Sequence, residues 1–173
     1  MDFVREIIIK KRKSVQDIMN IIIAVMVAFI LFYLMLIQFV SGKLAILIPI
    51  EIALVIYGCY LVISSGNVEF EYSSVNGWLD VDKIVSRKKR KNIAKVEVKN
   101  VEYFALFDGE HIPVAEDSSV DKYIDASSNL DNEGVYFMIY YNNNQKVCLF
   151  FEPDTDMVEN FANYIPRSLN HTF

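Results

Sequence analysis

The sequence is poor in the residues that most often carry catalysis or bind metals. Its 173 residues include two cysteines, Cys59 and Cys148, and two histidines, His111 and His171. Cys59 lies inside an apolar run and Cys148 in an expected strand, so the thiols are too far apart for a disulfide or a metal pair. The histidines stand alone in a loop and in the C-terminal tail. Neither has the neighbours that a zinc site or a catalytic triad requires.

Glycine is also scarce, with 6 residues, and none of them belongs to a phosphate-binding loop or to the turn that exposes a nucleophilic serine. The stretch Asn129–Gly134 has the oxygen spacing that opens a calcium loop. The twelfth position of that loop, however, is Tyr140 instead of the glutamate that calcium needs. We therefore expect no metal, no cofactor and no enzymatic activity.

The sequence is rich in long apolar runs. Two of them, Ile18–Val40 and Leu44–Ile63, are separated only by Ser41-Gly42-Lys43. About 20 residues of helix, at a rise of ~1.5 Å, span the ~30 Å core of a bilayer, so each run is long enough to cross it. Residues 18–64 therefore predict a tight transmembrane helical hairpin, and the first run is too long for the core of a cleaved signal peptide.

Basic residues predict the orientation of this hairpin. Arg5 and Lys10–Lys13 precede the first run, whereas the connection carries only Lys43. Because basic residues favour the cytoplasmic side, the protein is expected in the cell membrane with both termini on the cytoplasmic side. Residues 1–17 form a basic, amphipathic leader with two open interpretations. It is either a short helix lying on anionic lipid or a solvated segment that only fixes topology.

After residue 66 the pattern changes to a period of two, which is typical of strands. Val68, Phe70 and Tyr72 alternate with glutamates, and Asn76-Gly77 predicts a hairpin turn before a strand at Trp78–Val85. Four more strands are expected, at Ile93–Val98, Val101–Phe107, Val135–Tyr141 and Lys146–Phe151.

Asp108–Gly134 contains eight acidic residues and one basic residue, and it is expected to be mostly loop with a short strand or helical turn at Val120–Ala126. Asp154 or Asp156 offers an N-cap for a closing helix that ends at Pro166. Residues 67–166 thus predict a cytosolic α+β domain, an antiparallel sheet or barrel closed by one C-terminal helix, and 167–173 are expected to be a tail.

This layout resembles bacterial membrane proteins with a pleckstrin-homology-like (PH-like) domain. The resemblance rests on the helical hairpin, the opening hairpin of strands with Asn76-Gly77-Trp78-Leu79-Asp80-Val81, a basic loop and a closing helix that carries Phe161. It covers most of residues 4–166 and is similar to an uncharacterised family of small two-span bacterial proteins. The family implies no reaction or site residues, and the acidic stretch 108–133 is longer than a tight loop of such a domain needs.

Two features are candidates for function. The first is Glu51, because an ionisable residue inside a membrane span is costly and by default functional. With a turn at Gly42, Glu51 is level with Leu34, which brings Tyr33 within reach as a hydrogen-bond partner. Glu51 then either fixes helix packing as a neutral side chain, or contacts a partner span, or takes part in transport. Pro49 is expected to bend this helix.

The second candidate is a run of five adjacent cations, which is expected on a loop between strands. Such a run can meet anionic lipid head groups, as the loop between early strands of PH-like domains often does. It can also be solvated, or pair with the acidic stretch 108–133. The run consists of Arg87, Lys88, Lys89, Arg90 and Lys91.

The chain is therefore expected to be an integral membrane protein with a cytosolic binding or scaffold module. Its partners would be a protein, a second copy of itself or anionic lipid. A nucleic acid is not expected, because the chain has a formal net charge of -5. The alternative is an accessory subunit of a transporter or a membrane enzyme complex, in which Glu51 makes an intramembrane contact.

Overall fold

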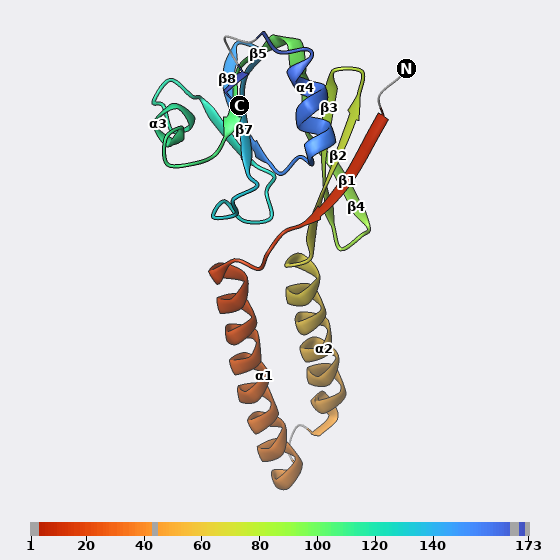
Figure 1. Cartoon of the computed structure of the whole chain (residues 1–173). Coiled ribbons are helices and arrows are strands. Elements are labelled where there is room, and N and C mark those ends of the chain that lie inside the picture. Colours follow the sequence, from red (N-terminus) through yellow and green to blue (C-terminus); the bar gives the residue numbers. More distant parts are fainter. Residues whose placement is uncertain (1–3, 43–44, 167–169, 172–173) are drawn as a thin grey trace. The chain divides into compact units, whose positions relative to one another are not determined.

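The protein divides into two units, which are described separately. The computed structural model describes residues 4–42, 45–166 and 170–171. One unit, the helical unit, comprises residues 13–67, and the other, the β domain, comprises the chain up to Arg12 and from Val68 onward. The β domain is thus built from two separate pieces of chain, and the helical unit is an insertion between them (Figure 1).

The helical unit contains α1 (Val15–Ser41), a 3-10 turn at Ala45–Leu47 and α2 (Ile48–Ser65). A capping box starts α1, because the Ser14 side chain accepts a bond from the backbone of the first turn and the Asp17 carboxylate accepts one from the Ser14 N–H at 2.9 Å. Lys43 of the predicted connection and Leu44, the first residue of the predicted second run, lie outside the described residues.

The two helices contact each other along a seam with the spacing of a coiled coil. The half-buried residues of α1 recur every three or four positions, as do those of α2, which favours a packed pair of helices. Neither helix has a fully buried residue, and both are long and apolar enough to cross a membrane. On α1 the seam consists of Ile21, Ala24, Ala28, Leu31, Met35 and Gln38, and on α2 of Ile48, Glu51, Val55, Gly58 and Val62.

Part of the N-terminal segment is a strand, so both interpretations of residues 1–17 are wrong for Val4–Lys10. β1 (Val4–Lys10) pairs antiparallel with β2 (Val68–Val75). Ile7 and Ile9 pack against the main core, which is the period of two expected of a strand with one buried face. The helical spacing of the segment is overridden because β2, which follows both helices in the chain, supplies its hydrogen-bond partners.

Sheet A has the order β1-β2-β3-β4, with β3 at Trp78–Val85 and β4 at Lys89–Glu97. The predicted hairpin at Asn76-Gly77 is confirmed, with φ values of 46° and 81° that match the turn favoured between twisted strands. A Cβ on Gly77 would lie 2.8 Å from the ring of Tyr164, so this turn requires glycine for space as well.

Sheet B has the order β6-β8-β7-β5-β9. The predicted hairpin of β7 and β8 is confirmed, but β6 pairs with β8, and β9 with β5, in parallel. An entirely antiparallel arrangement is therefore wrong, and the described residues form two sheets rather than a closed barrel. The strands are β5 (Val101–Leu106), β6 (Lys122–Asp125), β7 (Tyr136–Asn142), β8 (Gln145–Phe151) and β9 (Asn170–His171). Part of the expected tail is thus a strand, and residues 167–169, 172 and 173 of it lie outside the described part.

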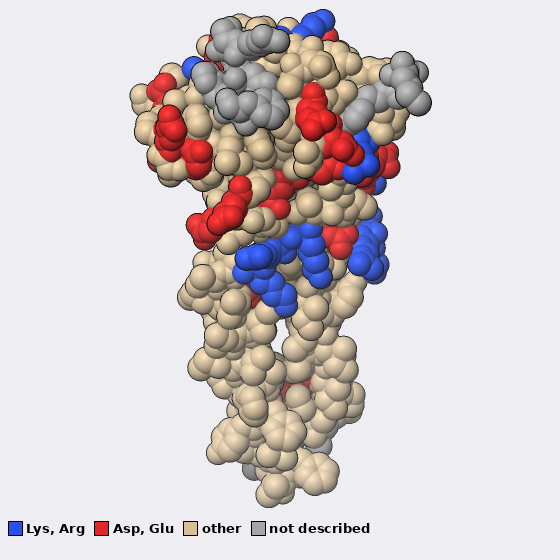
Figure 2. Space-filling model, in the orientation of Figure 1, with Lys and Arg blue, Asp and Glu red and all other residues tan. Residues whose placement is uncertain are grey.

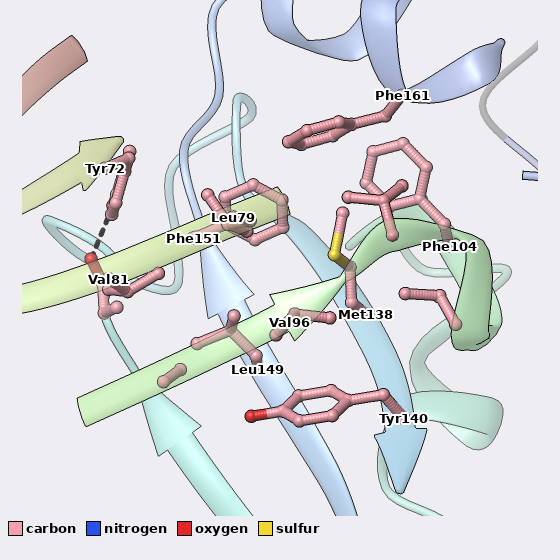
Figure 3. Close-up of a cluster of buried hydrophobic side chains, with 14 of the residues drawn as sticks. Tyr72, Leu79, Val81, Val96, Phe104, Met138, Tyr140, Leu149, Phe151 and Phe161 are labelled. Carbon is pink, nitrogen blue, oxygen red and sulfur yellow. Dashed lines mark hydrogen bonds between the residues drawn. The ribbon is translucent and has the colours of Figure 1, made fainter. Parts of the chain in front are cut away.

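The main core lies between the two sheets and α4 (Thr155–Ala162). Asp154 is the N-cap, because its carboxylate accepts a bond from the Met157 N–H at 3.0 Å. Phe161 then points from α4 toward Phe104 and Phe151, with ring centres 6.0 Å and 6.4 Å apart (Figure 3). One helix therefore closes the core, as the sequence predicts.

A second core lies on the opposite face of sheet B. The acidic stretch contains α3 (Ile112–Ala115) and covers alternate residues of β7 and β8, among them Phe137 and Phe150. Cys148 is buried there, and burial raises the pKa of its thiol to about 12. The stretch is therefore a cover that buries the second face of sheet B, and not only a solvated loop.

Two buried tyrosines of the main core differ in their hydrogen bonds. The Tyr72 hydroxyl donates to the Ala126 carbonyl at 2.6 Å (Figure 3). It also accepts from the Glu152 N–H at 3.3 Å. For the Tyr140 hydroxyl, no partner is found among the described residues. Tyr72 thus ties sheet A to the segment that follows β6, whereas the Tyr140 hydroxyl is desolvated without compensation.

Removal of each hydroxyl should therefore have opposite effects on stability. We expect Tyr72→Phe to lower the free energy of unfolding by about 1–3 kcal/mol, since it leaves a buried carbonyl unpaired. Tyr140→Phe should be neutral or stabilising. Urea unfolding followed by the fluorescence of Trp78, the one tryptophan of the chain, measures both variants. Equal losses in the two would contradict this assignment.

Candidate functional site

One end of sheet A collects basic residues from two distant parts of the chain. β1 ends where β2 begins, with Lys10 opposite Glu69 and the Lys11 N–H donating to the Val68 carbonyl at 2.9 Å. Val68 in turn lies opposite Val85, the last residue before the β3–β4 turn. The basic segments 10–12 and 87–91 therefore lie at the same end of sheet A, and we call these residues with Lys83 the basic end (Figure 2).

The run of five cations is not a loop along its whole length. Ser86 and Arg87 adopt left-handed conformations, with φ of 54° and 55°, and form the turn with Lys88. β4 already begins at Lys89, earlier than the predicted Ile93. Because side chains of a strand alternate between its two faces, the run is divided between the two faces of sheet A.

The arginines of the run pair with acids on the outer face of sheet A. Arg87 Nε lies 3.3 Å from Glu69 Oε1, and Arg90 contacts Glu71 and, at 3.8 Å, Asp82. The glutamate side chains are only 12% and 13% exposed. The pairing expected with the acidic stretch 108–133 is therefore wrong for these arginines, since their recorded partners belong to β2 and β3.

Lys11 is on the opposite, inner face and links β1 to β6. Its ammonium group lies 2.9 Å from Asp125 Oδ2 and 5.7 Å from the centre of the Phe70 ring. Partial burial of Asp125 works to raise the pKa of its carboxyl, but the hydrogen bonds from Lys11 and Ser127 outweigh burial and lower it. The Arg12 N–H also donates to the Ser128 carbonyl at 2.9 Å, which fixes the end of β1.

Glu51 has a different partner and position from those predicted. The Gln38 side-chain amide donates to Glu51 Oε1 at 2.7 Å, and Tyr33 is 64% exposed. Because α2 begins only at Ile48, the pairing of the helices shifts by one turn relative to a turn at Gly42 alone. Glu51 therefore lies in the first turn of α2. Pro49 starts this helix rather than bending it, since a first-turn residue needs no N–H partner.

A comparison with protein families matches residues 1–171 to the family described as Bacterial PH-like domain (DUF6106). The chain belongs to this family. No curated protein and no solved structure matches it. The match covers β1, both helices and the β domain, so the helical insertion lies within the pattern of this bacterial PH-like family.

The resemblance drawn from the layout is thus confirmed, whereas the site of this PH-like domain was only partly predicted. The run at 87–91 was found because its charges are adjacent in the sequence. Lys11 and Lys83 were missed, because their place at the same end of sheet A as the run depends on strand register. A signal for β1 was present in Ile7 and Ile9, which fit a strand as well as a helix.

Proposed function

We propose that the protein is a membrane-anchored binding module without catalytic activity of its own. α1 and α2 cross the cell membrane, and the basic end of the β domain contacts anionic lipid on the cytoplasmic side. At ~1.5 Å per residue, the 18 residues of α2 are about as long as a bilayer core, ~30 Å, and the 27 residues of α1 exceed it at ~40 Å. Their apolar side chains are exposed on all sides outside the seam, which favours lipid over water.

The observation that carries this proposal is the place where the chain enters and leaves the helices. Residues 11–14 join β1 to α1, and residues 66 and 67 join α2 to β2. Both connections leave the β domain at its basic end. A short covalent tie to membrane-spanning helices would keep these cations, rather than the acidic cover of sheet B, next to the lipid.

The free energy of these lipid contacts is large enough to orient the β domain at the membrane, but too small to be what recruits the protein there. A Lys or Arg near an anionic leaflet contributes about 1 kcal/mol. Since Arg87 and Arg90 are already paired with acids, and Lys11 with Asp125, the contribution comes mainly from other lysines of the basic end such as Lys89. A few such contacts are weak compared with two apolar spans. They would therefore fix how an already anchored domain faces the membrane.

The topology can be tested with single cysteines in a Cys59→Ser, Cys148→Ser background. Ser41→Cys, at the end of α1, should react with a membrane-impermeant thiol reagent in intact cells. Ser118→Cys, in the exposed part of the acidic stretch, should react only after permeabilisation. Labelling is read by mass shift. Reaction of both cysteines in intact cells, or of Ser118→Cys alone, would refute the hairpin orientation.

The lipid contact can be tested by amine reactivity in nanodiscs. Lys89 should react more slowly with a water-soluble amine reagent in anionic than in neutral lipid, by about fivefold for a contact of about 1 kcal/mol. Lys99, which is bound to Glu97 at 2.6 Å beyond the far end of β4, is the internal control. The difference should vanish at about 0.5 M NaCl, because salt screens exposed charges. If the ratio of the reaction rates in neutral and anionic lipid is the same for Lys89 and Lys99, the proposed contact is contradicted.

A further inference from the structure

Two lysines of the basic end lie directly opposite each other on neighbouring strands. Lys83 of β3 pairs with Lys91 of β4, and the same row continues to Phe70 of β2, which is buried on the inner face. Like charges directly opposite each other destabilise an antiparallel pair of strands. The sheet therefore bears an electrostatic cost at this row.

A third lysine approaches this row from the other sheet. Lys122 of β6 lines, with Lys83 and Lys91, a groove of about 330 Å³ between the inner face of sheet A and the edge of sheet B. Phe70, Ile93 and Ile124 also line it. The groove therefore combines three ammonium groups with an apolar wall.

The charges of these lysines are not compensated within the described residues. Asp125 is the one acidic residue that lines the groove, and its carboxylate is already bound by Lys11 and Ser127. No ion pair is recorded there for Lys83, Lys91 or Lys122. By contrast, Arg90, the neighbour of Lys91 on the opposite face, has two acidic partners.

We propose that this groove binds an anionic ligand through a phosphate group. Lysine is a common phosphate ligand because its ammonium is a compact point charge with three donors. Three such groups, from β3, β4 and β6, can surround the oxygens of one phosphate. The volume leaves room for a glycerol-sized organic part against the apolar wall, as in other small-ligand sites. The phosphate belongs either to a lipid head group or to a soluble phosphate ester.

The site is independent of the membrane topology, since all its residues belong to the β domain. Only the lipid source rests on the proposed function. An anion would also remove the repulsion between Lys83 and Lys91. Ligand binding should therefore stabilise the β domain, and the loss of one lysine should relieve the same repulsion in the free protein.

The test uses the full-length protein in neutral nanodiscs, with thermal unfolding followed by the fluorescence of Trp78. Glycerol 1-phosphate is titrated against NaCl of equal ionic strength. We expect glycerol 1-phosphate to raise the unfolding temperature of the wild type more than NaCl does. Lys83→Gln and Lys91→Gln should each weaken the apparent affinity about tenfold or more, as expected for the loss of a hydrogen bond to a charged group.

Four variants separate binding from folding. Without anion, Lys83→Gln and Lys91→Gln should unfold at the wild-type temperature or above it, because repulsion is relieved. Lys91→Arg should keep most of the affinity. Lys95→Gln, on the same strand but paired with Asp80 on the outer face, should bind like the wild type.

A second arm distinguishes the source of the phosphate. If nanodiscs with phosphatidylglycerol stabilise the protein in a Lys83-dependent manner and glycerol 1-phosphate does not, the ligand is a lipid head group. Saturation by glycerol 1-phosphate in neutral nanodiscs supports a soluble ester. The groove proposal would be overturned if glycerol 1-phosphate shifts the unfolding temperature no more than NaCl does and phosphatidylglycerol gives no Lys83-dependent stabilisation. A wild-type response of both glutamine variants in both arms would overturn it as well. Such a result would not change the lipid dependence of the amine reactivity of Lys89, which tests the proposed function. The two proposals can therefore fail separately.

Discussion

The pairing of β1 with β2 is the constraint on which the rest of the structure depends. It joins the two pieces of the β domain across an insertion of two long apolar helices. An antiparallel pair has the end of one strand beside the beginning of the next, so the helices must leave and return at the same end of sheet A. The N-terminal residues are therefore part of the fold, and the helices are a very long connection within a hairpin of strands.

The same pairing organises the charges of the β domain. Lys10, Lys11 and Arg12 come to lie at the same end of sheet A as the β3–β4 turn, with β2 between them, and strand alternation then divides the cations between two faces. On the outer face the arginines meet a row of acids and are neutralised. On the inner face Lys83 and Lys91 remain opposite each other, and the described part of the chain supplies no acidic partner to either. The basic end thus combines an outer face, on which arginines are paired with acids, with an inner groove lined by lysines.

Local signals in the sequence predicted the fold well where the partners are close in the chain. The turn at Asn76-Gly77 and the N-cap at Asp154 are examples, because their geometry depends on a few neighbouring residues. The strand β1 was not predicted, since its partner follows both helices. The Gln38–Glu51 contact was missed because it depends on where α2 begins, and one extra turn before Ile48 changes the register of the helix pair. Lys83 does not belong to a run of adjacent cations in the sequence, so only the sheet register reveals its place in the site.

The most direct test of this account is to remove the helical insertion and keep β1. A chain in which residues 13–66 are replaced by Asn-Gly should close β1 onto β2 through a two-residue turn, since the Lys11 N–H already bonds to the Val68 carbonyl. We expect a soluble protein that unfolds cooperatively, whereas a matched chain that begins at Val68 should lack a stable fold. If the chain without β1 unfolds at the same temperature as the fused chain, β1 is not part of the β domain and the account is wrong.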